Sequence, residues 1–242
     1  DDIFINSKSI SSETINMAEF DSGILSSKCG FKFVYSDSII TFSSTSPFQY
    51  YDFNFYGDLK FDFTKKNDNF FGKGKLSKNY LKINSNYFSF LKDSFISGNA
   101  SVSIEAADGV NKFICNGGSI EWEKNKNSLI VYRGNLDFFL PKIKLYLDFD
   151  YADIDLNKNL IQFENEIYDK ISYIKLKNNF ECSISKLSYD YISDISKFSL
   201  SEKIKSSDNF IIPSNDFIEI NSLGYLSPFV ANIIPQKKIA KE

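Results

Sequence analysis

The sequence contains no histidine, and this absence removes several classes of chemistry. Histidine is the commonest general base near neutral pH, the commonest zinc ligand and the usual partner of a serine or cysteine nucleophile. No G-x-S-x-G elbow or phosphate-binding loop occurs, and the glycines of residues 71–75 (FGKGK) are expected in a turn between strands. We therefore expect a protein that is not an enzyme and that holds no cofactor or metal.

Other scarcities narrow the class of protein further. With one Met, one Trp and little Ala, long helices are disfavoured, and no apolar run approaches the roughly 18–20 residues that span a bilayer. The net charge of −3 and the pI near 5.2 provide no field that would attract a phosphate backbone, so no nucleic acid is expected as a partner. The chain begins with Asp1 rather than Met, which agrees with a removed signal peptide or anchor and equally with an arbitrary boundary.

Cysteine is also rare. Cys29, Cys115 and Cys182 are odd in number and widely spaced, which matches neither a zinc site nor a dense disulfide framework. Cys115 alternates in phase with Phe113, and Cys182 with Phe180, so both thiols are expected to point inward. Buried free thiols are favoured over a Cys115–Cys182 bridge, which stays open as an alternative.

What the chain has in abundance is aromatic residues, 25 Phe and 14 Tyr, and they recur with a period of two. Residues 53–63 place an apolar residue or Gly at every odd position, the pattern of a long half-buried strand. Residues 96–106 repeat it, with Ile96 inward and Ser97 outward. Residues 143–151 repeat it again before the phase switches near Ala152 and Asp153, where we expect a β-bulge. Polar turn residues separate the strands at 65–69, 108–109, 124–127 and 157–159.

A weak internal repeat links these strands. Phe90, Trp122, Leu156 and Tyr191 occupy equivalent places with a period of roughly 32–35 residues. The aligned units are residues 86–100, 118–136, 151–167 and 188–204, and each reads as a strand, a polar turn and a second strand. Such hairpins cannot bury an apolar face alone, so we expect them to stack.

The ends of the chain differ from this repetitive middle. We divide the chain into an N-terminal extension or cap at residues 1–50, a unit of stacked strands at residues 51–205 and a C-terminal strand and tail at residues 206–242. The first part contains one convincing strand pair, at residues 31–35 and 39–42. The last part contains a short strand at 217–220, a possible start of a short helix at Ser227 and a solvated tail from Gln236.

The repeated units resemble the OstA-like family, which includes the periplasmic lipopolysaccharide-transport proteins LptA, LptC and the N-terminal domain of LptD. The best matching positions are residues 152–163 (ADIDLNKNLIQF), echoed by residues 129–136, and the resemblance covers about residues 80–205. It implies an open, twisted β-jelly-roll with acyl chains along its apolar interior. It also implies that end strands join LptC-like and LptD-like envelope proteins edge to edge. The chain departs from the family in its length, its richness in Phe and Tyr, and its unmatched first fifty residues.

Three functional hypotheses follow. The first is a periplasmic bridge protein that carries lipopolysaccharide or another (glyco)lipid in an apolar groove toward the outer membrane. The second is a surface adhesin or structural β-solenoid with a packed interior. The third is a β-sandwich glycosidase using carboxylates at i and i+2 (121/123, 148/150 or 153/155), although the polar face of an amphipathic strand explains these pairs better. The lipid-binding residues expected in the first case are Phe53, Phe55, Leu59, Phe61, Phe63, Val102, Ile104, Trp122, Leu145, Leu147, Phe149, Ile154, Leu156, Ile161 and Phe163.

An open sheet also has free edges, where unpaired backbone groups attract another strand. Residues 176–184 have few of the lysines, prolines or bulges that usually block an edge, so we expect an exposed edge strand there. This interpretation predicts a homo-oligomer, or pairing with a related envelope protein, by strand addition.

Overall fold

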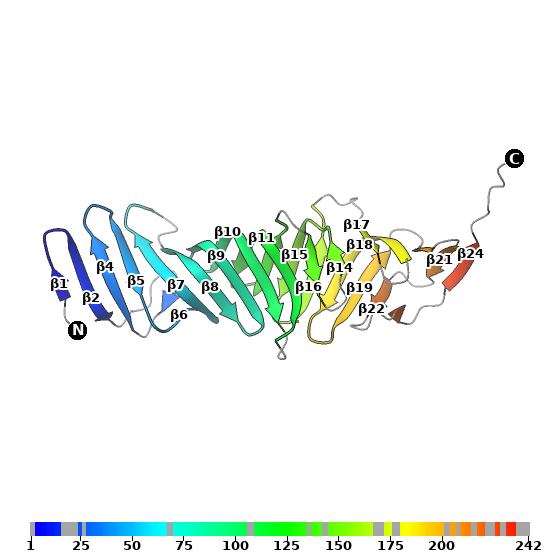
Figure 1. Ribbon diagram of the computed structural model, residues 1–242, viewed down its shortest axis with the longest axis horizontal. Coiled ribbons are helices and arrows are strands. Elements are labelled where there is room, and N and C mark those ends of the chain that lie inside the picture. The colour runs from blue at the N-terminus through cyan, green and yellow to red at the C-terminus, as the bar shows by residue number, and fades with distance from the viewer. Residues whose placement is uncertain are drawn as a thin grey trace.

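The computed structural model is all-β, as the period-two pattern predicts, and its strands form one long antiparallel sheet (Figure 1). It describes residues 3–15, 24–25, 28–66, 70–105, 109–134, 137–141, 145–166, 172–175, 180–200, 204–206, 209–213, 217–220, 226–227 and 231–235. Among these residues no helix is long and apolar enough to cross a membrane. β1 and β24 lie at opposite ends of an elongated molecule.

The sheet is folded over on itself into two layers, because long strands run through both layers and shorter strands pair with only one half of them. Along its length β7 pairs first with β6 and then with β5. In the same way β11 pairs first with β13 and then with β12. The strand β18 pairs first with β17 and then with β16. The long strands are β7 (Phe53–Asp62), β8 (Phe70–Lys78), β9 (Leu81–Phe90), β10 (Ser94–Glu105), β11 (Asn111–Glu123) and β18 (Phe180–Asp190).

Layer A is the half of the sheet that contains the starts of β7, β9, β11 and β18 and the ends of β8 and β10. It is completed by β3 (Ile24–Leu25), β6 (Phe48–Tyr50), β13 (Phe138–Leu140), β14 (Leu145–Leu147), β17 (Ser172–Lys175), β20 (Ile204–Ser206), β21 (Asn209–Pro213) and β24 (Ala231–Pro235).

Layer B contains the opposite halves of the same long strands. It is completed by β1 (Ile3–Ile5), β2 (Ser9–Ile15), β4 (Cys29–Val34), β5 (Ile39–Ser43), β12 (Ser128–Tyr132), β15 (Tyr151–Asp155), β16 (Leu160–Glu164), β19 (Ile195–Leu200), β22 (Phe217–Ile220) and β23 (Leu226–Ser227). The strands of residues 3–50 therefore extend the same sheet, through the pairing of β5 with β7.

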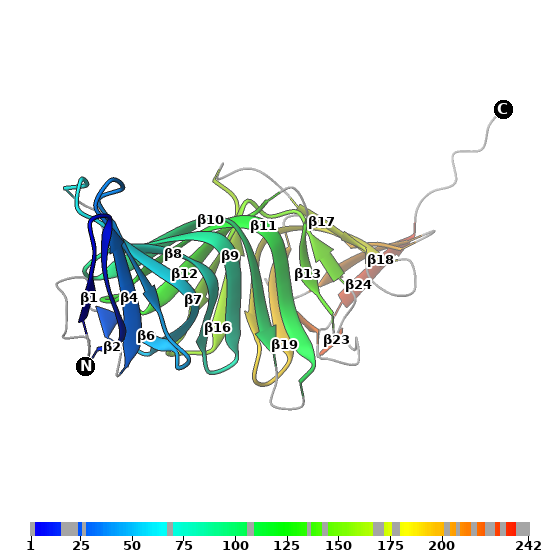
Figure 2. The same cartoon turned by 60° about the vertical axis from the view of Figure 1, so that its left-hand side comes forward.

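The two layers meet at a crease, which we define as residues 57, 74, 85–87, 98–100 and 116–118 of strands β7 to β11. The pairing register shifts here, between Gly72 and Gly74 on β8 and between Ser97 and Ala100 on β10. Figure 2 shows the long strands bending as they pass from one layer to the other. Two serine hydroxyls replace ladder hydrogen bonds at this point: Ser85 Oγ lies 3.1 Å from the Gly98 carbonyl, and Ser97 Oγ lies 2.6 Å from the Tyr87 carbonyl.

The crease corrects one sequence-based orientation. Ile96 is 39% exposed and Ser97 only 4% exposed, which is the reverse of the prediction. The period-two pattern holds on each side, with Phe95 buried in layer B and Val102 buried in layer A. Because Asn99 takes a left-handed conformation (φ 52°), the extra residues at the crease turn the side-chain phase over.

Two further local predictions, for residues 71–75 and for residues 143–151, are wrong where the structure describes them. Residues 71–75 lie inside β8 rather than in a turn. The described residues 145–151 are not part of one bulged strand, since β14 and β15 are separate strands: β14 pairs with β13, and β15 pairs with β12 and β16. The phase switch after Phe149 therefore reflects a change of layer. Residues 143–144 lie outside the described residues. Near the C-terminus Leu226–Ser227 is a strand, and residues 228–230, on which the predicted start of a helix falls, lie outside the described residues.

The internal repeat corresponds to four hairpins stacked side by side in layer B. They are β9–β10, β11–β12, β15–β16 and β18–β19, each antiparallel. Backbone hydrogen bonds join successive turns: Lys124 N–H donates to Asp93 O (2.9 Å), Leu156 to Asn127 (3.2 Å) and Tyr191 to Asn159 (3.2 Å). The predicted strand pair at 31–35 and 39–42 and the predicted strand at 217–220 are confirmed as β4, β5 and β22.

The predicted edge strand at residues 176–184 is wrong where the structure describes it. Residues 180–184 belong to β18, which pairs with β17 on one side and with β19 and β20 on the other. Residues 176–179 and the predicted tail from Gln236 lie outside the described residues. A strand with neighbours on both sides has no free ladder to offer a partner.

Candidate functional site

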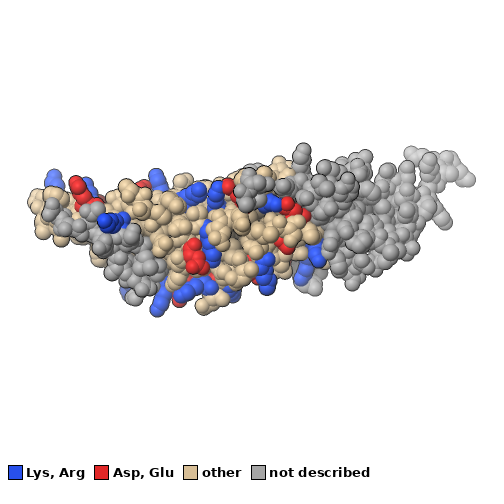
Figure 3. Space-filling model, turned by 90° about the horizontal axis from the view of Figure 1, so that it is seen from below, with Lys and Arg blue, Asp and Glu red and all other residues tan. Residues whose placement is uncertain are grey.

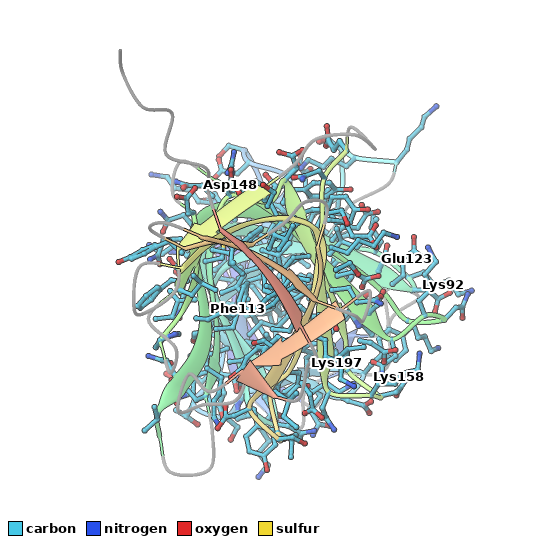
Figure 4. All side chains as sticks on the ribbon, turned by 90° about the vertical axis from the view of Figure 1, so that its right-hand side faces the viewer. Lys92, Phe113, Glu123, Asp148, Lys158 and Lys197 are labelled. Atoms are coloured by element: carbon cyan, nitrogen blue, oxygen red, sulfur yellow. The ribbon has the colours of Figure 1, made fainter. Side chains whose placement is uncertain are left out.

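The residues expected to line a lipid groove form the core between the two layers. Twelve of the fifteen are at most 5% exposed, Phe61 and Leu156 are half-buried against the same cluster, and Phe63 is exposed at 56%. In the end-on view of Figure 4, Phe113 points into this interior, whereas Lys92, Glu123 and Lys158 lie outside it.

Rings from opposite layers interlock in this core. Phe53 of layer A lies 5.1 Å from Trp122 and 5.3 Å from Phe95 of layer B, between ring centroids. Farther along the molecule, Phe113 and Phe163 repeat the contact at 5.9 Å. Such edge-to-face and tilted pairs are the usual geometry of well-packed aromatic residues.

The exposed fractions of the core side chains show how much space remains between the two layers. Val102, Leu147 and Phe149 are 0% exposed, so no space large enough for a water molecule lies beside them. An acyl chain is wider than a water molecule. It could contact these side chains only after the two layers had moved apart.

Polar contacts also join the layers along the rim, the side of the folded sheet opposite the crease. Tyr50, at the end of β6, places its hydroxyl 2.6 Å from the carbonyls of both Leu91 and Ser94 in the β9–β10 turn. Tyr51 donates to Asp93, and the Lys124 Nζ lies 4.2 Å from the Tyr51 ring centroid. The hydrogen bond from Tyr51, together with Lys124, holds the pKa of the Asp93 carboxyl below its ordinary value.

Two lysines make further contacts across the rim. Lys78 of layer A lies 2.9 Å from Asn127 Oδ1 in the β11–β12 turn. Lys112 of layer A forms an ion pair with Asp194 in the β18–β19 turn, where the side chains are 7% and 15% exposed, and Tyr189 donates a hydrogen bond to the same carboxylate (2.8 Å). Removing one partner of such a buried ion pair strongly destabilises the folded protein, because the other charge stays buried without its partner. Together with Tyr50, these contacts hold the rim shut.

The carboxylates of Asp153 and Asp155, one of the pairs at i and i+2, have different surroundings. Burial raises the pKa of Asp153. Asp155 is partly buried too, but hydrogen bonds from Lys158 and Asn157 outweigh that effect and lower its pKa, and its carboxylate caps the 156–159 turn. In the part of the chain that the structure describes, no group of three His, Cys, Asp or Glu side chains could hold a metal ion. Cys115 is a buried free thiol, so it is not bridged to Cys182.

The outer face carries a polar groove that the sequence-based reasoning missed. It occupies about 600 Å³ across β7 to β10 at the crease, with Gly57 and Gly74 at its floor. These glycines pair with each other, and a Cβ on either would lie 2.1 Å from a carbonyl oxygen of the neighbouring strand. An isolated glycine inside a strand often marks a close backbone approach, and that was the available signal. A smaller hollow of about 270 Å³ lies where β16, β18 and β19 meet.

Polar side chains from four strands, β7 to β10, form the walls of the larger groove at the crease. Lys73 and Lys75 come from β8, Asn84 and Asn86 from β9, and Asn99 from β10. On the side of the molecule seen in Figure 3, lysine and acidic residues are interspersed over the described part of the surface. No protein-family model, no curated protein and no solved structure matches this chain.

Proposed function

We propose that this protein is a non-enzymatic structural or adhesive β-rod, exported from the cell, whose interior is packed and whose outer faces and strand ends make its contacts. The observation that carries this proposal is the burial of the candidate lipid-lining residues, twelve of the fifteen being at most 5% exposed. The rim contacts of Tyr50, Lys78 and Lys112 add to it, because a conduit that loads through its side needs that rim to open.

A lipid-carrying bridge of the OstA-like type is the second candidate. It is supported by a single sheet that folds around an apolar interior, the architecture that an open β-jelly-roll shares. Edge-strand pairing with related envelope proteins belongs to the same proposal. The two candidates differ in whether the interior admits a guest molecule.

Displacement of a fluorescent fatty acid separates the two candidates. The packed rod is expected to show no saturable uptake of the probe at any concentration below its micelle threshold. Saturable uptake that lipopolysaccharide or a phospholipid displaces would overturn the packed rod in favour of the lipid bridge.

A pair of neighbouring variants locates any uptake that is seen. Ile104 is 1% exposed in the core, whereas Ser103, the residue before it in β10, is on the opposite face of the strand. Ile104→Asp buries an unpaired carboxylate and should cost more than about 4 kcal/mol of unfolding free energy, while Ser103→Asp should cost less than about 0.5 kcal/mol. If Ile104→Asp stays folded and loses only probe binding, Ile104 lines a groove instead.

A further inference from the structure

The polar groove at the crease has the dimensions and chemistry of a ligand site. Its volume of about 600 Å³ lies within the range of roughly 300–1,000 Å³ that small-molecule sites occupy. Its floor is the backbone of Gly57 and Gly74, which is held by the pairing of β7 with β8. A ligand in this groove would therefore contact a rigid surface rather than a mobile loop.

Four of the polar side chains that line the groove make no ion pair or hydrogen bond within the described part of the protein, whereas Ser85 bonds to the Gly98 carbonyl. Lys73 and Lys75 make no ion pair there, although Lys78 on the same strand bridges Asp52 at 3.2 Å. The amides of Asn84 and Asn86 are likewise without a hydrogen bond among the described residues. Their donors and acceptors face a hollow, where a ligand can reach them.

The lining favours one class of ligand. Each asparagine amide offers two donors and an acceptor, which suits the alternating hydroxyl groups of a sugar. Tyr56, 50% exposed at the edge of the groove, offers an aromatic surface with a polar tip. Two lysines against the single carboxylate of Asp58 favour an anionic ligand.

We infer that this groove binds an acidic oligosaccharide, with the asparagine amides on its hydroxyl groups and Lys73 and Lys75 on its carboxylate or sulfate groups. The inference rests on the proposed function, since it gives the adhesive outer face its ligand. Peptide addition fits the groove poorly because each of the strands β7 to β10 already has a neighbouring strand on both sides, so none is an edge strand. An acyl chain fits poorly because the walls are polar.

Isothermal titration calorimetry tests the site. The probes are hexamers of galacturonic acid, heparin-derived hexasaccharides and, as the neutral probe, maltohexaose. At least one acidic probe should bind saturably and more weakly as salt is raised, since the charged groups are exposed. The double variant Lys73→Ala/Lys75→Ala should weaken that binding about tenfold or more.

Matched variants make the result specific to the groove. Lys60→Ala removes an outer-face lysine of β7 that does not line the groove, and it should leave binding unchanged. Asn84→Ala/Asn86→Ala should weaken binding without altering its salt dependence. Far-ultraviolet circular dichroism checks that each variant is folded.

Three outcomes would overturn the inference: no acidic probe binds the folded protein, maltohexaose binds as tightly as the acidic probes, or the double lysine variant binds as well as the wild type. None of them bears on the packed interior, which the fatty-acid assay decides separately. Uptake of fatty acid would reject the packed rod whether or not the groove binds sugar.

Discussion

At the scale of single residues, Tyr50 holds the two layers together. Its ring packs in the core at 5.9 Å from Trp122, and its hydroxyl reaches the carbonyls of Leu91 and Ser94 on the opposite layer. Tyr50→Phe keeps the ring and removes the hydroxyl that bonds to the opposite layer, while the Ser94 carbonyl still accepts from the Leu91 N–H (2.8 Å). We expect a loss of about 1–3 kcal/mol in the free energy of unfolding, measured by chemical denaturation.

Tyr35→Phe is the matched control for this variant, because Tyr35 is 42% exposed and, among the described residues, its ring makes an edge-to-face contact with Phe33. The control should change the free energy of unfolding by less than about 0.5 kcal/mol. Equal effects of the two variants would mean that the hydroxyl of Tyr50 does not join the layers.

Buried tyrosines also set the response to alkaline pH. Burial raises the pKa of Tyr191 to about 12, and burial with a hydrogen bond to Glu164 raises that of Tyr151 to about 12, from the ordinary value of 10.0. The unfolded chain releases these protons first, so the stability they contribute is complete below pH 10 and is lost as the pH rises toward 12. Unfolding free energies measured across that range should fall, and Tyr191→Phe should make the fall shallower.

Tyrosinate absorbance gives an independent reading of the same titration. Tyr191 should ionise with an apparent pKa of about 12, above the ordinary value of 10.0 for a tyrosine. Ionisation of every tyrosine in one step near pH 10, with the fold intact, would contradict the burial of Tyr191.

At the scale of elements, the crease decides how one sheet becomes two layers. Gly57 and Gly74 lie face to face with φ near +158° and +155°, and a Cβ on Gly57 would meet the Lys73 carbonyl at 2.1 Å. Gly57→Ala should therefore force β7 and β8 apart and cost about 1–3 kcal/mol. Thermal and denaturant unfolding of the variant measure this cost.

Gly98→Ala provides the comparison within the same crease, because nothing lies within 4 Å of the added Cβ. We expect it to change the free energy of unfolding by less than about 0.5 kcal/mol. If Gly57→Ala proved equally neutral, the close approach of β7 and β8 would not be a requirement of the fold.

At the scale of the whole molecule, the structure moves the candidate edge for assembly from residues 176–184 to β1. Among the described residues β1 pairs only with β2, and its Ile3, Phe4 and Ile5 are 61%, 55% and 71% exposed. An exposed apolar edge strand is a template for another strand. We expect concentration-dependent self-association in sedimentation equilibrium, and Phe4→Lys should weaken it.

Ile192→Lys is the control for assembly, since Ile192 is 53% exposed but lies in the β18–β19 turn, away from the edge. This variant should associate as the wild type does. A wild-type protein that stays monomeric at high concentration would contradict assembly through β1.

Many strand faces and hairpin turns of this protein could be predicted from the sequence alone. The face of a strand depends on alternation between near neighbours, so the pattern of residues was enough to assign Phe53, Phe55 and Leu59 to the interior. Hairpin turns are equally local, and the left-handed conformations of Asn127 (φ 47°) and Asn159 (φ 57°) are ones that asparagine tolerates well.

Only the tertiary structure decided what depends on partners distant in sequence. Ile96 and Ser97 exchange faces because β10 changes its register with β11 at the crease, and nothing in the residues beside them records that register. Residues 180–184 do not form a sheet edge because β19 and β20 pair with β18 on the side away from β17. The polar groove exists because Gly57 of β7 pairs with Gly74 of β8. The close packing of the two apolar faces likewise depends on the side chains that each layer presents to the other, and these come from strands far apart in the chain.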